Sequence, residues 1–248
     1  MIIIKSEQEI DIMRESGKVT GHILKALEDF IKPGISTMDV DQFVEKTILA
    51  HKMIPSFKGY GGFPGSACVS INDEVVHGIP SKERRLKEGD IVSVDVGATH
   101  KGYVSDAART YPVGKISEEA QKLIDVTRES FFAGLEYCKV GFRISDISHA
   151  VQLRAEEAGY GVIRDFVGHG VGRDMHEEPQ IPNYGKAGRG PRIAKGMVFA
   201  IEPMINQGTY EVETLLDDWT VVTLDGKLSA HYENTVVITN GEPELLTL

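Results

Sequence analysis

Apolar residues recur at helical spacing in two long stretches of the chain, at residues 10–31 and 120–138. Each stretch follows a serine and a glutamate, Ser6-Glu7 in the first case and Ser117-Glu118 in the second. Serine followed by acidic residues is typical of a helix N-terminus, because its hydroxyl accepts a hydrogen bond from a free backbone N–H. The pattern therefore predicts two long amphipathic helices.

The segments after these helices resemble each other. Residues 32–40 read KPGISTMDV and residues 139–147 read KVGFRISDI, an offset of 107 positions. In each segment a glycine ends the long helix and an aspartate begins a shorter one. These shorter helices are predicted over about 39–51 and 146–158, so the chain contains two copies of one helical unit.

Carboxylates recur in the same register within β-rich runs. GDIVSVD ends at Asp95 and GMVFAIE ends at Glu202, which preserves the offset of 107. SDAARTYPVG and YENTVVITNG carry Asp106 and Glu233 at an offset of 127. We therefore predict one α/β domain with internal pseudo-two-fold symmetry, with antiparallel strands in the middle and helices outside. The domain spans 1–248, and its halves are about 1–115 and 116–248.

Composition narrows the classes of function. The formal net charge is −10, which argues against general binding to nucleic acid or to an anionic membrane. No apolar run approaches the ~18 residues of a membrane span, and the N-terminus does not read as a secretory signal. Two cysteines, Cys68 and Cys138, cannot form a disulfide framework. We expect a cytoplasmic protein.

One predicted hairpin brings two carboxylates together. Residues 91–96 and 103–110 read as strands joined by a turn at 99–102. A turn centred between His100 and Lys101 places Asp95 directly opposite Asp106, with Cβ atoms about 4.5–5.5 Å apart. Like charges at that distance repel each other, and a bound cation removes the conflict. Two solvated aspartates on a half-exposed hairpin are the alternative.

Three further side chains complete a possible metal-binding set. Glu202 and Glu233 lie in apolar strand sequence, where an unpaired carboxylate is costly, and a buried Lys or Arg partner is the alternative. His169 lies between glycines, which allow close backbone approach, although a packed core histidine has the same pattern. Four carboxylates and one imidazole suit Mn²⁺, Fe²⁺, Co²⁺ or Zn²⁺. Two such ions about 3.5–4 Å apart could bridge and deprotonate a water for hydrolysis.

Over essentially its whole length the sequence resembles the type I methionine aminopeptidases. The stretches that carry the resemblance are SINDEVVHGIP (70–80), VSVDVGATHKGYVSDAART (92–110), GHGVGRDMHEEP (168–179), FAIEPM (199–204) and SAHYENTVV (229–237).

The resemblance implies the pita-bread fold and a site for two divalent metal ions, with Co, Mn, Fe, Zn or Ni as candidates. Asp106 and Glu233 match the residues that bridge the two ions in the family. Asp95 matches a ligand of one ion, and His169 and Glu202 match ligands of the other.

The resemblance also implies catalytic roles. His77 matches a residue that hydrogen-bonds the substrate and helps to move a proton at the scissile amide. His176 matches a donor to the carbonyl oxygen as negative charge develops. Glu202 matches the base or proton shuttle for the attacking water.

The expected substrate pocket is apolar and shaped for methionine, whose thioether offers mainly dispersion contacts. The matching wall residues are Phe57, Tyr60, Phe63, Cys68, Met175 and Trp219. The sequence departs from the usual family pattern at Phe57, where a smaller residue is common, and at Met175, where Phe is common. A monovalent cation held by backbone carbonyls in some members matches Asn72, Glu74 and Ser229.

The expected function is removal of the initiator methionine from nascent polypeptide N-termini, preferentially before a small, uncharged second residue. We expect a monomer, with the ribosome as a candidate partner. One alternative in the same fold is an X-Pro aminopeptidase or prolidase, disfavoured because helical sequence begins by residue 6 and leaves no room for a preceding domain. A non-catalytic binding protein of this fold and a dinuclear phosphoesterase are further alternatives, disfavoured by the complete ligand set and by the acidic charge.

Overall fold

The two long helices begin where the serines predict. The structure, a computed structural model, describes residues 1–248. Helix α1 spans Glu7–Phe30, and the Glu9 N–H donates to Ser6 Oγ while Glu9 accepts from the Ser6 N–H at 2.8 Å. Helix α3 spans Glu118–Leu135, and the Ala120 N–H donates to Ser117 Oγ at 3.1 Å. Both serine caps are confirmed.

The two shorter helices start earlier than predicted. Helix α2 spans Thr37–Ala50 and α4 spans Ile144–Glu157. The aspartates assigned to their first positions lie in the first turn instead. Asp39 accepts from the Ser36 N–H at 2.7 Å, and Asp146 accepts from the Arg143 N–H at 2.8 Å. Each carboxylate reaches back over the helix start, as in a capping box, so the boundary precedes it.

The predicted hairpin forms, but its turn is centred one residue later, so each residue faces a partner two positions further along β5 than predicted. Strands β4 (Ile91–His100) and β5 (Tyr103–Pro112) are joined by a two-residue turn, Lys101-Gly102, with φ of 48° and 81°. Positive φ at both positions is the hairpin turn that matches strand twist. Asp95 therefore faces Ala108, and the predicted direct pairing with Asp106 is wrong. Asp95 and Asp106 are diagonal neighbours on one face, still within mutual reach.

The strands form four antiparallel sheets. The first contains β1 (Ile54–Pro55), β2 (Ala67–Ile71), β4 and β5. The second contains β7 (Gly168–Gly170), β8 (Glu177–Ile181), β9 (Val198–Ile201), β14 (Asn234–Val237) and β15 (Glu244–Leu245). The third sheet contains β6 (Gly161–Val162), β10 (Met204–Asn206) and β13 (Ser229–His231). The fourth contains β3 (Glu74–Val76), β11 (Val212–Thr214) and β12 (Val221–Thr223).

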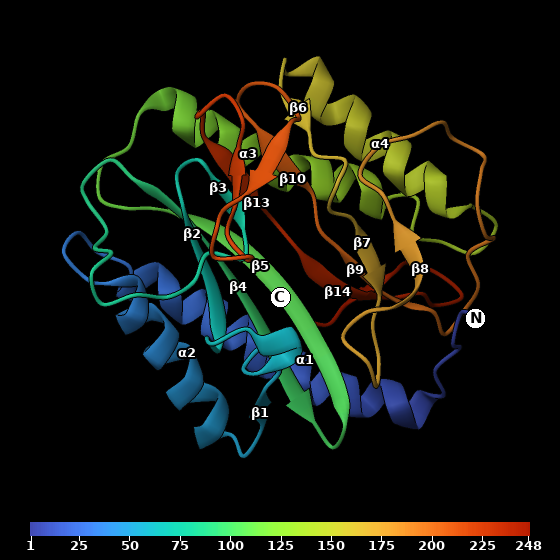
Figure 1. Cartoon of the computed structure of the whole chain (residues 1–248). Coiled ribbons are helices and arrows are strands. Elements are labelled where there is room, and N and C mark those ends of the chain that lie inside the picture. The colour runs from blue at the N-terminus through green and yellow to red at the C-terminus, as the bar shows by residue number, and fades with distance from the viewer.

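The helices lie outside the strands. Figure 1 shows α1 and α2 on one side of the molecule, α3 and α4 on the other, and the strands between them. One core cluster packs α1 and α2 against β2, β4 and β5, and another packs α3 and α4 against β9 and β14. None of the helices is both long and apolar enough to cross a membrane.

The two main sheets meet along β5 and the residues that lead into β14. The Glu233 N–H donates to the Ala108 carbonyl at 3.0 Å. The Asp106 N–H donates to Thr235 Oγ1 at 2.9 Å, and the Thr235 hydroxyl donates to the Asp106 carbonyl at 2.8 Å. This seam brings a carboxylate from each half of the chain to the centre of the molecule.

Candidate metal centre and active site

Thirteen side chains line one cavity of about 140 Å³. Every residue predicted from the sequence as a divalent-metal ligand, catalytic residue or pocket wall is among them. The lining residues are Phe57, Tyr60, Phe63, Cys68, His77, Asp95, Asp106, His169, Met175, His176, Glu202, Trp219 and Glu233. The volume suits one side chain rather than a drug-sized molecule, for which pockets are about 300–1,000 Å³.

Four carboxylates gather at the polar end of the cavity. Asp106 and Glu233 are buried, whereas Asp95 and Glu202 keep a partly exposed surface. Burial raises the pKa of all four carboxyls, and for Asp95, Glu202 and Glu233 the charges of neighbouring carboxylates raise it further. None of the four forms an ion pair with Lys or Arg, so the paired-glutamate alternative does not describe this site.

His169 offers a free nitrogen to this cluster. A Cβ at Gly168 or Gly170 would lie 2.5 Å or less from a backbone oxygen of a neighbouring strand, so only glycine allows this close approach. His169 Nδ1 lies 2.8 Å from the Gly170 carbonyl, to which it can donate only when protonated. Nε2 then carries the lone pair, and it lies 3.4 Å from Glu202 Oε1 and 3.9 Å from Asp106 Oδ2. Burial lowers the pKa of His169 to about 4, so the imidazole is neutral at pH 7.

The donor set fits a divalent metal. Asp95 Oδ1, Asp106 Oδ1 and Glu233 Oε1 are buried without a hydrogen-bond partner. Asp106, His169 and Glu233 each offer a ligand atom, all within 4.8 Å of one another. Buried, unpaired carboxylates are expensive, and coordination of a hard cation satisfies both their charge and their lone pairs.

His231 belongs to this cluster and was missed in the sequence. Its Nε2 is buried without a hydrogen-bond partner, 3.7 Å from Glu233 Oε2 and 3.8 Å from Glu202 Oε2. Together with Asp95 and Glu233 it forms a second group of possible metal donors. Burial lowers its pKa to about 3. The spacing of two residues between His231 and Glu233 was the available signal, since such residues share a face in an extended chain.

Two more histidines, His77 and His176, line the same cavity as the four carboxylates. His77 has a φ of 60°, rare for a residue with a side chain, and its ring contacts Phe166 and Trp219 edge-on. Burial lowers the pKa of His77 to about 4. The His176 ring centroid lies 4.4 Å from that of His169, and its Nδ1 lies 2.8 Å from Tyr60 Oη. Burial lowers the pKa of His176 as well, so both rings are neutral hydrogen-bonding groups near pH 7.

A buried ion pair holds the segment that carries Met175 and His176. Lys5, near the N-terminus, pairs with Glu177, and both side chains are about 3% exposed. Glu177 Oε1 also accepts the Arg173 N–H at 2.9 Å. The pair fixes the turn at residues 173–177 through its backbone. Neither Lys5 nor Glu177 was singled out in the sequence, because they are 172 positions apart.

The apolar end of the cavity is closed by buried side chains. Phe57, Phe63, Cys68 and Met175 are each 6% exposed or less. Phe63 and Trp219 meet edge to face at 5.1 Å between ring centroids. Burial raises the pKa of the Cys68 thiol well above its usual range, so Cys68 is an apolar wall group and not a nucleophile.

The residues predicted to hold a monovalent cation lie outside this cavity. The Ser229 N–H donates to the Asn72 carbonyl at 2.8 Å, so these two segments are adjacent. The Glu74 side chain accepts from the Ile71 N–H and pairs with Arg84. Only backbone carbonyls would serve such a cation, and the site stays a prediction.

The chain matches metallopeptidase family M24 over residues 11–240. A methionine aminopeptidase from Clostridium acetobutylicum is 60% identical over 248 residues, covering 100% of this chain and 99% of the relative. The crystal structure of a methionine aminopeptidase from Thermotoga maritima superimposes with a TM-score of 0.98 at 48% identity, covering 100% of this chain and 99% of that one. A prolidase from Pyrococcus horikoshii has a TM-score of 0.78 at 25% identity, covering 100% of this chain and 64% of that one.

These matches establish both the fold and the class of the protein. The arrangement of helices and antiparallel sheets is the pita-bread fold that the sequence predicted, shared with the prolidase. The chain belongs to metallopeptidase family M24 and, within it, to the methionine aminopeptidases.

Proposed function

We propose that this protein removes the N-terminal methionine from newly made polypeptides, preferentially when the second residue is small and uncharged. One observation carries the proposal. A single cavity has hard oxygen and nitrogen donors at one end and an apolar wall at the other. The geometry suits an enzyme that recognises one apolar side chain and cleaves the bond beside it.

Two divalent ions are proposed at the polar end. Asp106 and Glu233 would hold both ions, Asp95 would complete one set, and His169 with Glu202 would complete the other. Bound divalent ions supply Lewis acidity and a water of lowered pKa. The unsatisfied carboxylate oxygens and the absence of any Lys or Arg partner support this assignment.

The remaining roles belong to the side chains of the chain itself. Glu202 lies at the edge of the carboxylate cluster with part of its surface in the cavity, a suitable place to accept a proton from the attacking water. When the Tyr60 hydroxyl donates to Nδ1 of His176, Nε2 carries the proton and can donate to the substrate carbonyl. His77, neutral and fixed by its aromatic neighbours, would hydrogen-bond the scissile amide.

Substrate selection follows from the two ends of the cavity. Phe57, Phe63 and Met175 offer dispersion contacts to a thioether and no buried polar group for a hydrophilic side chain. The polar end is strongly acidic and favours a free α-amino group. An N-formyl group removes that charge and adds bulk, so a formylated peptide is expected to be a poor substrate.

The setting of the reaction is part of the same proposal. Residues 1–248 would act as one catalytic domain, because the halves at about 1–115 and 116–248 each contribute carboxylates to one site. Two buried free thiols and a formal net charge of −10 are consistent with a cytoplasmic monomer that works on nascent N-termini, with the ribosome as a candidate partner.

Removing divalent metal is expected to abolish methionine release from Met-Ala-Ser, and adding it back should restore release. The measurement is methionine production after dialysis against chelator, followed by titration with Mn²⁺ or Co²⁺. Activity that saturates at two equivalents supports two ions, and saturation at one equivalent contradicts the dinuclear assignment. Methionine release that persists in chelator would rule out metal-dependent hydrolysis.

Comparison of Met-Ala-Ser with Ala-Pro peptides separates the proposal from an X-Pro peptidase. The apolar wall fits methionine, so we expect at least a hundredfold higher kcat/KM for Met-Ala-Ser, about 3 kcal/mol of difference in transition-state binding. Faster cleavage of Ala-Pro would reassign the site to X-Pro chemistry.

Replacing His231 with alanine is expected to weaken metal binding about 10- to 100-fold, because its Nε2 lies within 4 Å of carboxylate oxygens of both Glu202 and Glu233. The measurement is the metal Kd by calorimetry, which needs no turnover. His149→Ala, on the exposed surface of α4, is the matched control. An unchanged Kd in the His231 variant would show that this histidine only fills space.

A further inference from the structure

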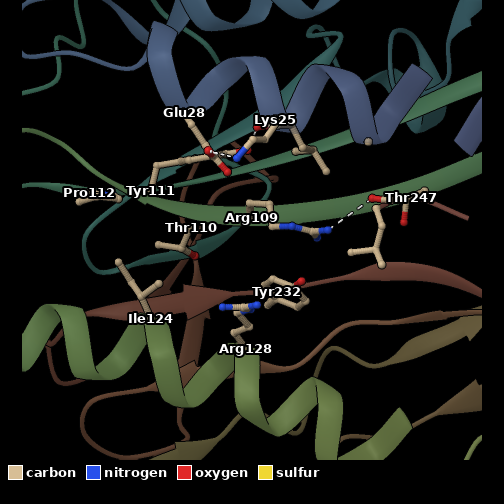
Figure 2. Close-up of a pocket in the computed structure, with 13 residues that line it drawn as sticks. Lys25, Glu28, Arg109, Thr110, Tyr111, Pro112, Ile124, Arg128, Tyr232 and Thr247 are labelled. Carbon is tan, nitrogen blue, oxygen red and sulfur yellow. Dashed lines mark hydrogen bonds and ion pairs between the residues drawn. The ribbon is translucent and has the colours of Figure 1, made fainter. Parts of the chain in front are cut away.

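A second cavity, of about 570 Å³, lies between α1 and α3. Figure 2 shows α1 along one side, α3 along the other and β5 between them. Side chains alternate along β5, so Asp106 points into the carboxylate cluster whereas Arg109 and Tyr111 point to the helices. This cavity therefore occupies the opposite face of the sheet from the proposed metal centre. Its volume is in the usual range for a small-molecule site.

Basic groups outnumber acidic groups in the lining of this cavity. Arg109 from β5 and Arg128 from α3 both contribute to the lining, and neither forms an ion pair. The one acidic side chain of the lining, Glu28, already pairs with Lys25 at 2.5 Å. Two guanidinium groups therefore share a cavity whose other negative group is the α-carboxylate of Leu248, the last residue of the sequence, and that carboxylate pairs with neither arginine.

Arg109 forms the fixed part of this cationic pair. Its Cζ lies 4.1 Å from the Tyr232 ring centroid. Nη1 donates to the Glu233 carbonyl at 2.5 Å, and Nη2 donates to Asn234 Oδ1 at 2.7 Å. All of its acceptors are neutral, and its Nε–H has no partner. Burial lowers the pKa of Arg109, and the nearby charge of Arg128 lowers it further.

Arg128 forms the adaptable part. It is exposed, it makes no hydrogen bond, and its Cζ lies 5.6 Å above the Phe132 ring. Its guanidinium retains all five N–H donors in the planar fork that suits tetrahedral or planar oxyanions. An exposed guanidinium without hydrogen bonds, beside a fixed and partly buried one, is an arrangement that an anion can bridge.

We propose that the cavity between α1 and α3 binds a small organic phosphate, whose phosphoryl oxygens bridge Arg128 and Arg109. Two like charges facing one cavity repel each other, and an anion turns that repulsion into two charge-assisted contacts. A phosphate ester suits the cavity better than inorganic phosphate, because the cavity is far larger than an inorganic ion and includes apolar surface from Leu24 and Ile124.

Arg109 connects the proposed phosphate site to the proposed metal centre. Arg109 donates to the backbone carbonyl of Glu233, whose carboxylate lies in the cluster on the other face. An anion that binds Arg109 therefore alters the hydrogen bond that Arg109 donates to the backbone of Glu233, a proposed metal ligand. Coupling of this kind is reciprocal, so bound phosphate and bound metal should alter each other's Kd by the same factor.

The test is calorimetric titration of phenyl phosphate into the full-length protein, both metal-loaded and metal-free. We expect one site in each form. Arg128→Gln should weaken binding about tenfold or more, since it removes a charged donor from an exposed helical position without disturbing the core. Lys122→Gln, which removes a charge from α3 outside the cavity, should leave the Kd within twofold.

Three results would overturn the proposal. Binding that requires metal would place the phosphate at the carboxylate cluster. Equal weakening of phosphate binding by Arg128→Gln and Lys122→Gln would show that binding depends only on the overall charge of α3. Binding of phenylacetate as tight as that of phenyl phosphate would remove the selectivity for phosphate. A Kd that rises in Arg128→Gln alone, in both metal states, supports the site.

Discussion

Glu202→Gln is expected to lower kcat for methionine release about 10²- to 10⁴-fold, the usual contribution of a general base. The amide keeps the size of the side chain but cannot accept a proton at neutral pH. Glu202 is one of four carboxyls in the cluster, and its partial exposure to the cavity distinguishes it from the buried Asp106 and Glu233. The measurement is steady-state hydrolysis of Met-Ala-Ser at saturating metal.

The design separates loss of the base from loss of metal. The metal Kd of Glu202→Gln is measured alongside its turnover, and activity is compared at equal metal occupancy. Glu213→Gln, at an exposed position on β11, is the matched control for charge. Turnover within threefold of the unchanged protein at full occupancy would remove Glu202 from the role of base.

Much of the architecture was predictable because it depends on local patterns. Ser6 and Ser117 mark helix starts through hydrogen bonds that span three residues, and the structure has both. The family resemblance then supplied thirteen positions that the fold places around one cavity. Their chemical roles stay predictions, since proximity alone does not test function.

The errors arise where a short-range pattern has more than one solution. The two-residue shift in the partner of Asp95 follows from the position of the turn, because Lys101 adopts positive φ, which the surrounding sequence does not predict. His231 escaped notice because its partner Glu202 is distant in sequence. Lys5 and Glu177 form a pair across 172 positions, which no periodicity reveals.

The metal-free protein is expected to lose stability between pH 7 and pH 8.5, whereas the metal-loaded protein should not. The buried carboxyls have folded-state pKa values above their unfolded values, about 7 for Asp106 and well above the usual range for Glu233. A retained proton stabilises the fold fully below the unfolded pKa, and that stabilisation is lost as pH rises through the folded pKa. His169 and His231 have lowered pKa values, which act only below pH 6.5.

The expected size follows from proton linkage. One proton held by the folded chain but not by the unfolded chain gives a slope of about 1.4 kcal/mol per pH unit for as long as it is held. For a domain of this size that is a fall in Tm of roughly 3–6 °C per pH unit, measurable by circular dichroism or calorimetry. Metal removes the repulsion that retains the proton, and at 100 times its Kd it adds about 2.7 kcal/mol. The stabilisation by metal should therefore grow as the pH rises.

Asp106→Asn provides the internal control for this experiment. The amide removes one of the mutually repelling charges, so the metal-free variant should lose less stability between pH 7 and pH 8.5 while binding metal poorly. Glu213→Gln should behave like the unchanged chain. A metal-free protein whose Tm is constant over the interval would mean that the carboxylates are ionised without metal. The repulsion between buried carboxylates, from which the metal centre is inferred, would then be absent.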